Sequence, residues 1–450
     1  MNIEILDVIE CKIPKALGDI VKPTLSFMAF FYQQGPYRKV RREYMKSVMA
    51  KGEHCYYFPA GLLQRVLNYC KERNIKVTII GEVERLKATA KPALKGITLR
   101  EEQQRLVDKA IKDQRGVLVA PTGIGKSLLC LAVISAFPKA STLWLCHTKD
   151  LMYQAAEFAE KHLDKPKIGF IGDGVNNPQK LTFATRQSFI KHVGALGCDY
   201  DIVVIDEVHH LSGDGQYQTL MRNILAPVRI GLTATMPTDK EAILAIEGAL
   251  GPIIDEVTIK EGQERGTMAS IKIRFLKVPV DYKVKDLRKY QDVYRAGVVE
   301  NTAQHSLIIE TAAKHVKKGD SVLILVTQIA HGENLLDECE RQHVQAVFAQ
   351  GATEGIIRKE IKDALNSKDI HVVIATTIWN EGLNIPELNV IINAAGGKSE
   401  IRTLQIIGRG LRLTKTKRQL IMYDVMNLNH SFLLSHLGER LAIYTEMGWM

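Results

Sequence analysis

The sequence contains no closely spaced pair of cysteines. Its seven cysteines are odd in number and scattered over 450 residues, without a CxxC pair. Such an arrangement excludes a disulfide framework and a cysteine-based zinc site. It predicts reduced thiols in a cytoplasm.

Long apolar runs, repeats and low-complexity tracts are also absent. No stretch approaches the ~18 apolar residues of a membrane span, and the acidic N-terminus lacks the apolar run of a secretion signal. Apolar residues make up 46% of the chain and charged residues 24%, as in ordinary globular proteins. A chain of this length exceeds one hydrophobic core, so we expect two or three ordered domains.

Positive charge is concentrated at the N-terminus. Of the formal net charge of +10, residues 1–95 hold 17 Lys and Arg against 9 Asp and Glu, whereas the remaining residues hold 43 against 41. Neutralisation of phosphates with release of counterions makes a polyanion the expected partner of such a segment. The alternative is an ordinary solvated surface.

Within this segment, residues 27–46 mix aromatic and basic side chains. Stacking on bases combined with phosphate contacts suits DNA. The expected DNA-binding residues are Arg38, Lys39, Arg41 and Arg42. We expect Phe27, Phe30 and Phe31 in the core of the small domain instead, because an apolar cluster usually forms its packing.

From residue 96 onward, short β-rich runs alternate with longer helical stretches, the pattern of parallel α/β sheets. Strands are expected at 117–119, 143–146, 168–171, 181–184, 202–205 and 229–232, and in a second set at 322–326, 344–348, 372–375, 390–392 and 420–423. The polar stretch 260–270 suggests a linker. We therefore expect α/β domains at 96–262 and 263–450, after a small α+β domain at 1–95 with a helix at 61–73 and a strand at 76–80.

The strongest local signal is APTGIGKS, Ala120–Ser127, between an apolar strand and an amphipathic helix. This is a phosphate-binding loop in its required context. Its glycines let the backbone wrap around phosphates, Lys126 reaches the β- and γ-phosphates, and Ser127 can ligate Mg²⁺. The expected cofactors are ATP and Mg²⁺, held by Pro121, Thr122, Gly123, Ile124, Gly125, Lys126 and Ser127. Ala120 departs from the generic pattern, which has glycine there.

Two acidic residues end the apolar strand of IVVIDEVHH. At the C-terminal edge of a parallel sheet, Asp206 and Glu207 would face the same nucleotide. Asp206 would hold Mg²⁺, and Glu207 would orient or deprotonate the attacking water. The adjacent His209 and His210 do not predict zinc, because no further ligand lies at a recognisable spacing.

A separate basic element, QIIGRGLR, lies far downstream at 405–412. Its spacing places Gln405, Arg409 and Arg412 near one face of a helix or its entry loop. Arginines there could stabilise a transferring phosphoryl group across a domain cleft, so that hydrolysis requires domain closure. Taken in isolation, the element is equally consistent with a basic surface helix.

Five segments in this order resemble the motifs of superfamily 2 helicases of the DExH kind. They are APTGIGKS, DEVH, GLTAT at 231–235, ATTIWNEGLNIP at 375–386 and QIIGRGLR. The resemblance implies two tandem RecA-like domains that hydrolyse ATP. The implied catalytic set is Lys126, Asp206, Glu207, Gln405, Arg409 and Arg412.

The resemblance also assigns further roles. It places Gln103, in LREEQ, on the adenine side of the nucleotide, and Glu381 and Gly382 near the nucleotide cleft. Thr233 and Thr235 would couple the nucleotide state to the nucleic acid. The implied DNA-contacting residues are His147, Thr148, Thr185, Gln187 and Thr376. Gln304 stands where relatives commonly have arginine.

Within the superfamily, GLTATMPTDK, HGENL and NEGLNIPELNVIINAAGGKS are similar to the branch of XPB, type III restriction motors and UvsW-like phage helicases. That similarity implies a phage enzyme that migrates Holliday junctions and regresses forks during replication, recombination and repair. The expected partners are branched or forked DNA and recombination or replication proteins, and a monomer in the bacterial cytoplasm is expected. Two alternatives remain open, an RNA helicase and a nucleotide-controlled DNA-binding scaffold with slow ATPase activity.

Replacing Arg409 or Arg412 by alanine is expected to lower ATP turnover by roughly 10³ or more, while largely sparing ATP affinity, because an arginine finger acts on the transition state. Turnover and nucleotide binding, measured separately for each variant, check this. Unchanged turnover in both variants would assign the element to the protein surface.

Overall fold

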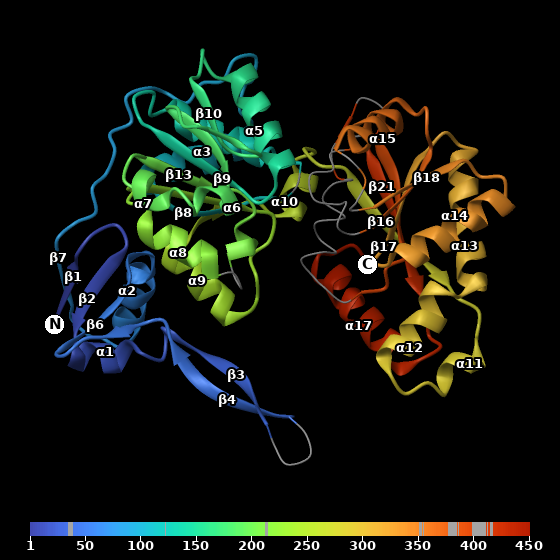
Figure 1. Ribbon diagram of the computed structural model, residues 1–450, viewed down its shortest axis with the longest axis horizontal. Coiled ribbons are helices and arrows are strands. Elements are labelled where there is room, and N and C mark those ends of the chain that lie inside the picture. The colour runs from blue at the N-terminus through green and yellow to red at the C-terminus, as the bar shows by residue number, and fades with distance from the viewer. Residues whose placement is uncertain are drawn as a thin grey trace. The chain divides into compact units, whose positions relative to one another are not determined.

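The computed structural model describes residues 1–34, 39–121, 123–211, 215–350, 353, 355–376, 385, 387–397, 411, 413–414 and 417–450. The chain forms two compact units, one of residues 1–120 and 125–257 and the other of residues 121–124 and 258–450. Each unit contains a mainly parallel sheet covered by helices (Figure 1). Among the described residues, no helix is long and apolar enough to cross a membrane.

The first unit begins with a small α+β domain, whose sheet has the strand order β5-β6-β2-β1-β7. Its elements are β1 (Asn2–Ile5), β2 (Glu10–Pro14), α1 (Lys15–Val21), β5 (Ala50–Lys51), β6 (Cys55–Pro59), α2 (Leu63–Glu72) and β7 (Thr78–Ile80). Leu17 of α1 and Val66 of α2 are buried against strand residues such as Phe58. The expected helix and final strand are therefore confirmed.

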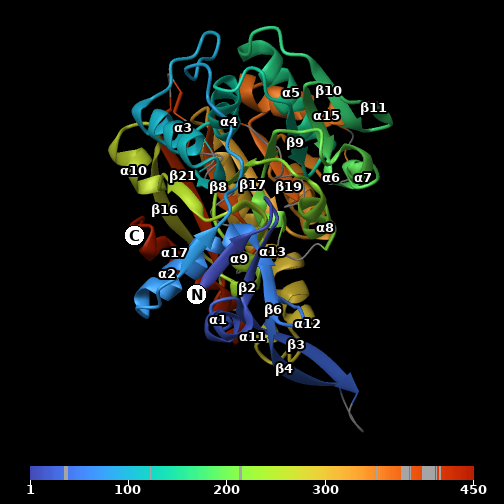
Figure 2. The ribbon, with the colours of Figure 1, turned by 90° about the vertical axis from the view of Figure 1, so that its left-hand side faces the viewer.

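Two further strands of this domain form a separate hairpin, β3 (Ser26–Gln34) and β4 (Lys39–Ser47), which pair only with each other. Figure 2 shows the hairpin extending from the small domain. Phe27, at its base, is 4% exposed, whereas Phe30 is 54% and Phe31 is 50% exposed. The prediction of a core position is thus wrong for Phe30 and Phe31, because no helix or second sheet of the described chain covers this part of the two-stranded ribbon.

The larger sheet of the first unit has the order β11-β10-β12-β9-β13-β14-β8-β15, and only β11 is antiparallel to its neighbour. The strands are β8 (Arg115–Val119), β9 (Thr142–Cys146), β10 (Ile168–Gly172), β11 (Val175–Asn177), β12 (Leu181–Thr185), β13 (Ile202–Ile205), β14 (Val228–Thr233) and β15 (Ile253–Glu256). The helices are α3 (Glu101–Asp113), α4 (Lys126–Ser135), α5 (Lys149–His162), α6 (Arg186–Phe189), α7 (Val193–Leu196), α8 (Gly215–Asn223) and α9 (Lys240–Leu250). All six predicted strands are confirmed; β11 and β15 were not expected.

Arg229 of β14 lies inside this unit with a side chain that is 1% exposed. Its guanidinium donates hydrogen bonds to the carbonyls of Met221 and Ile224 at the end of α8, and to that of Ala249 at the end of α9. Carbonyls of a last helical turn have no partner within their helix. One buried cation therefore caps two helices and ties them to the strand.

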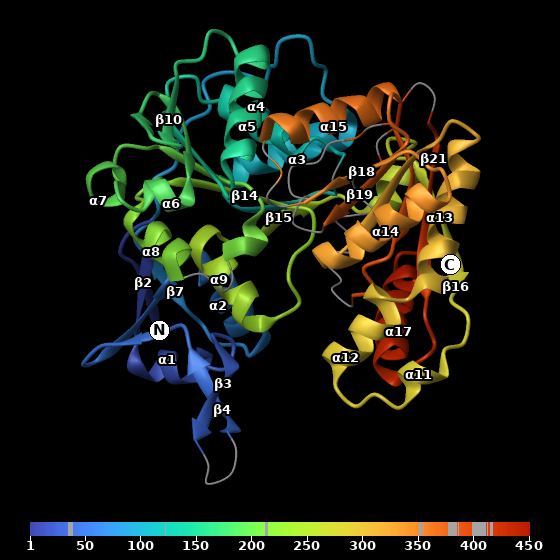
Figure 3. The same cartoon turned by 45° about the vertical axis from the view of Figure 1, so that its right-hand side comes forward.

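The second unit has an all-parallel sheet of order β16-β21-β20-β17-β19-β18, with helices packed against it (Figure 3). The strands are β16 (Ser270–Lys277), β17 (Ser321–Val326), β18 (Ala346–Ala349), β19 (Val372–Thr376), β20 (Leu388–Asn393) and β21 (Gln419–Met426). The helices are α10 (Ile259–Glu264), α11 (Tyr282–Lys285), α12 (Tyr290–Tyr294), α13 (Thr302–Val316), α14 (Ile329–Arg341), α15 (Gly355–Ser367) and α17 (Ser431–Glu446). Four of the five predicted strands lie within observed ones, while the strand predicted at 344–348 starts two residues before the observed β18. The stretch expected as a linker, 260–270, overlaps α10.

Candidate ATP-binding site

The carboxyl ends of five neighbouring strands bring the predicted residues of the first unit to one sheet edge. In the order β12, β9, β13, β14 and β8, these strands end at Thr185, Cys146, Ile205, Thr233 and Val119. The phosphate-binding loop follows β8, and Asp206 and Glu207 follow β13. His147 and Thr148 follow β9, so candidates for nucleotide and DNA contact lie on adjacent loops.

The phosphate-binding loop has the backbone that its glycines predict. Gly123 has φ +106° and Gly125 has φ +93°, both in the left-handed region that side chains rarely adopt. Gly125 immediately precedes α4, and its carbonyl accepts a hydrogen bond from the Leu129 N–H at 3.0 Å. Ala120 has no such φ, and its N–H donates to the Thr233 carbonyl at 2.9 Å. The position of Ala120 therefore does not require glycine, which explains the departure from the generic pattern.

Lys126 and Glu207 belong to one site. The Lys126 Nζ lies 3.4 Å from Glu207 Oε1, and the side chains are only 10% and 26% exposed. Lys126 is the first residue of α4 and Ser127 the second, so both stand at the positive end of the helix dipole. The cation expected at the phosphates thus lies beside the carboxylate expected to orient water.

Glu207 has a strained backbone, with φ +51°. A residue with a side chain in the left-handed region costs about 1–3 kcal/mol unless its surroundings impose it, and such residues cluster at functional sites. The Glu207 N–H donates to Asp206 Oδ1 at 3.0 Å, which fixes the two carboxylates relative to each other. The fold therefore aims Glu207 at a defined position despite this cost.

Asp206 is 8% exposed, and its pKa is raised from 3.8 to about 6. Burial is the main cause and the neighbouring Glu207 carboxylate the second, while Lys126 acts in the opposite direction. A desolvated carboxylate beside a second one suits a divalent cation, with the Ser127 hydroxyl as an additional ligand. Among the described residues, no three His, Cys, Asp or Glu side chains cluster as a metal cage.

Histidine rings connect the acidic pair to two neighbouring loops. His147 stacks on His210 with ring centroids 4.0 Å apart and planes at 6°, and His210 lies 4.2 Å from His209. His209 Nδ1 lies 3.4 Å from Glu207 Oε2 and 3.5 Å from Thr233 Oγ1. Burial lowers the pKa of His209, so the neutral imidazole is favoured.

This stack leaves no direct pattern in the sequence. His147 follows β9 and His210 follows β13, and only the sheet order makes these two strands neighbours.

Gln103 of α3 lies beside the phosphate-binding loop. Its Oε1 accepts a hydrogen bond from the Arg100 N–H at 2.9 Å in the capping box of α3. A Cβ built on Gly125 would lie 3.5 Å from Gln103 Nε2, so this amide borders the phosphate-binding loop.

The predicted DNA-contacting residues differ in accessibility. The Thr148 hydroxyl caps α5 by accepting a hydrogen bond from the Leu151 N–H at 3.3 Å, and the Thr185 hydroxyl donates to Ser188 Oγ at 3.0 Å. Gln187 is exposed. Thr376 ends β19 in the second unit and is 4% exposed.

Several predicted residues lie outside the described part of the chain. They are Arg38, Thr122, Glu381, Gly382, Gln405, Arg409 and Arg412, and Lys39 is described by its backbone alone.

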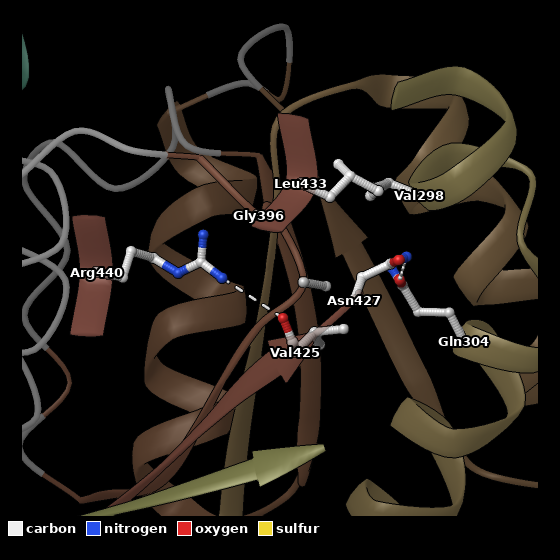
Figure 4. A pocket seen from close by; sticks show the side chains of 8 residues that line it. Val298, Gln304, Gly396, Val425, Asn427, Leu433 and Arg440 are labelled. Atoms are coloured by element: carbon white, nitrogen blue, oxygen red, sulfur yellow. Dashed lines mark hydrogen bonds between the residues drawn. The ribbon is translucent and has the colours of Figure 1, made fainter. Parts of the chain in front are cut away.

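Gln304 lies inside the second unit, at 1% exposure. Its Oε1 accepts a hydrogen bond from Asn427 Nδ2 at 3.2 Å beside a small pocket (Figure 4). The pocket is also lined by Arg440 of α17, whose guanidinium forms a buried two-point ion pair with Asp424 at 2.7 and 2.8 Å. A guanidinium therefore lines the pocket next to Gln304, supplied by a different helix.

Two protein families match this chain. The family described as Type III restriction enzyme, res subunit, matches residues 96–238, and the Helicase conserved C-terminal domain matches residues 303–414. The first region contains the phosphate-binding loop and the acidic pair, and the second contains β17, β18, β19 and β20. Together they define a two-domain helicase, an ATP-dependent enzyme.

Individual relatives agree with this class. The chain is 26% identical to the DNA 3'-5' translocase XPB2 of Sulfurisphaera tokodaii, covering 73% of this chain and 82% of that protein. It is 24% identical to the ATP-dependent DNA helicase uvsW of Enterobacteria phage T4, covering 72% and 68%. The Pyrococcus furiosus Hef helicase domain superposes with a TM-score of 0.53 at 16% identity over 76% of this chain and 98% of that one, which shows the shared fold.

The chain is therefore a superfamily 2 helicase with two tandem RecA-like domains, related to UvsW.

Replacing Asp206 by asparagine is expected to stabilise the protein at pH 8 and to lose this advantage toward pH 5. The folded pKa, about 6, lies above the unfolded value of 3.8. Wild-type stability from this group is therefore complete below the unfolded pKa and is lost as the pH rises through about 6. The full difference is up to about 3 kcal/mol.

Thermal unfolding at pH 5, 6.5 and 8, without nucleotide or divalent cation, measures this effect. Asp173→Asn is the matched control, because the Asp173 side chain is 41% exposed. A stability difference between wild type and Asp206→Asn that is the same at all three pH values would contradict the prediction.

Proposed function

We propose that this protein is an ATP-driven DNA helicase or translocase that remodels branched DNA, moving Holliday-junction branch points and regressing forks. The observation that carries this proposal is that the basic N-terminal domain and the ATP-binding domain form one compact unit. The relatives support DNA as the substrate, since XPB2 is named a DNA translocase and uvsW a DNA helicase.

The basic residues 1–95 would give the motor a second DNA-binding surface, in addition to that of the helicase domains, and a branched substrate needs more than one. The tandem helicase domains account for contact with one tracked strand, whereas a branch point presents several arms at once. Residues 1–95 carry 17 Lys and Arg against 9 Asp and Glu, enough to bind the phosphates of another arm. The same unit would thus hold two parts of one branched substrate.

The residues of the site divide the chemistry between them. Lys126 would bind the β- and γ-phosphates, and Asp206 and Ser127 would hold Mg²⁺, which neutralises charge on the phosphate oxygens. Glu207 would orient the attacking water or take its proton. We assign the stabilisation of the transferring phosphoryl group to Gln405, Arg409 and Arg412.

The nucleotide state would be passed along neighbouring strand ends. His209 lies within reach of both Glu207 and Thr233, and Thr233 Oγ1 donates to the Thr235 carbonyl at 2.8 Å. A change in charge at Glu207 during hydrolysis would therefore act on the segment after β14.

We propose the division into domains at 1–95, 96–262 and 263–450 for this motor.

ATP-dependent processing of a synthetic Holliday junction, a fork and a simple tailed duplex of matched sequence tests the proposal. We expect the junction and the fork to be processed several-fold faster than the tailed duplex, because only they engage the second basic surface. Lys126→Ala is the control and should process none of them, since it lacks the phosphate-binding cation.

Equal rates on all three substrates would reduce the protein to a general helicase. Faster processing of a matched RNA fork would make it an RNA helicase. Full processing by Glu207→Gln, which removes the water-orienting carboxylate, would instead indicate a scaffold controlled by nucleotide binding.

A further inference from the structure

The hairpin β3–β4 exposes large apolar side chains along its length. The most exposed are Met28 at 58%, Phe30 at 54%, Phe31 at 50%, Tyr44 at 45% and Met45 at 59%. An isolated two-stranded ribbon is at best marginally stable in water, and gathered exposed apolar groups mark an interaction surface. The hairpin is therefore built for a partner.

The register places these side chains on both faces of the ribbon. Paired residues of an antiparallel ladder share a face. Met28 pairs with Met45 and Phe30 with Glu43, which puts both pairs on a first face. On the second face, Phe31 pairs with Arg42 and Ala29 with Tyr44, and Phe31 and Tyr44 meet edge to face at 5.9 Å.

Basic side chains accompany the aromatic ones on each face. On the first face the Arg41 guanidinium lies 4.3 Å from the centre of the Phe30 ring and pairs with Glu43 at 3.0 Å. On the second face Arg42 stands opposite the exposed Phe31. Lys46 Nζ lies 5.7 Å from the ring of Phe27, which is buried at the base. Flat rings beside cations are the groups that stack on bases and bind phosphates, so nucleic acid is the partner with matching charge.

Exposure on both faces favours one position on DNA. A ribbon lying in the major groove presents one face to the bases and the other to solvent. The apolar side chains of this hairpin stand on both faces, as a body inserted between two separated arms requires.

The base of the hairpin is fixed in the first unit. The Ser26 hydroxyl donates to the Lys22 carbonyl at 2.7 Å, and the Ser47 hydroxyl to the Leu25 carbonyl at 3.2 Å. Phe27 is buried in the core of the small domain. The exposed part therefore projects from a rigid root.

The small domain is in turn joined tightly to α9 of the ATP-binding domain. Arg65 donates to both carboxylate oxygens of Glu247, at 2.6 and 2.8 Å. A Cβ on Gly61 would lie 2.0 Å from the Glu247 carbonyl oxygen, so only glycine permits this approach. Leu244 of α9 belongs to the core of the small domain. We call this contact the α9 joint.

The α9 joint lies close in sequence to the segment that ends β14. Thr235 is followed four residues later by Asp239, which caps α9 by accepting a hydrogen bond from the Ala242 N–H at 2.9 Å. Thr233, which lies beside His209, and the helix that carries the small domain are thus parts of one short stretch.

We propose that the β3–β4 hairpin is a wedge for the branch point of DNA, and that the α9 joint makes it move with the ATP-binding domain. Its rings stack on the bases that border the branch, and Arg41, Arg42 and Lys46 bind the adjacent phosphates. This inference rests on the proposed function and assigns its branch-recognising element.

The double variant Phe30→Ala/Phe31→Ala is expected to process junctions and forks roughly 10-fold more slowly or worse, relative to its ATP hydrolysis on single-stranded DNA. A loss of this order is expected when a base loses its stacking partner. The tailed duplex should be affected much less. Ile79→Ala, which removes a 44% exposed side chain from β7, is the control and should match wild type.

Fluorescence of 2-aminopurine placed at the branch point or within an arm gives a second measure. Wild type should change the signal at the branch point alone, and the double variant should not change it. An equal loss on junction and tailed duplex, or no loss, would overturn the wedge. If wild type itself processes branched DNA no faster than the tailed duplex, the proposed function fails instead.

The α9 joint is tested by reversing its ion pair. Each single variant, Arg65→Glu or Glu247→Arg, should raise the amount of ATP hydrolysed per junction processed several-fold. The reason is that the hairpin would no longer move together with the ATP-binding domain. The combined reversal should restore the wild-type ratio, which also shows that the domain folds. Arg73→Glu, in the exposed Arg73–Glu72 pair after α2, is the control. An unchanged ratio in both single variants would overturn the role of the joint.

Discussion

Parallel strands all end at the same edge of their sheet, and the chemistry of this protein depends on that constraint. β9, β13 and β14 are buried along their whole length, so a polar side chain within them would lose its hydration without a partner. A polar side chain inside such a strand needs partners of its own, as Arg229 of β14 has in helix-end and loop carbonyls, so most polar groups stand at the strand ends. Asp206, His147 and the Thr233 hydroxyl stand there, and the strand order makes them neighbours.

The groups at this edge are held against their own preferences. Asp206 keeps a charge out of water and Glu207 keeps an unfavourable backbone, and both features cost the folded state free energy. A cation that binds beside Asp206 would remove part of the free-energy cost of its buried charge. Because the cation binds only the folded protein, its binding would stabilise the fold.

Sequence alone predicts those parts of the structure in which one short pattern determines one conformation. Buried parallel strands are continuous apolar runs, and the glycines of the phosphate-binding loop need a left-handed backbone, so both could be placed. β11 is a polar edge strand and β15 is short and half exposed, so neither leaves a distinct pattern.

Contacts between distant segments were harder to predict. Stacking of His147 on His210 depends on which strands become neighbours, and sequence spacing does not contain that order. Phe30 and Phe31 look like core residues because exposure depends on the layer that covers a strand, and the hairpin has no covering layer. The Arg65–Glu247 pair joins two segments that nothing in their local sequence relates.

Arg229 has a consequence for how the first unit can move. It fixes the far end of α9 to β14, while the near end follows directly from the strand carrying Thr233. A helix held at both ends cannot slide along its sheet; it can only turn with it. The small domain and its hairpin are attached to that helix, so a fluorescent label on the hairpin would report each rotation of the ATP-binding domain directly.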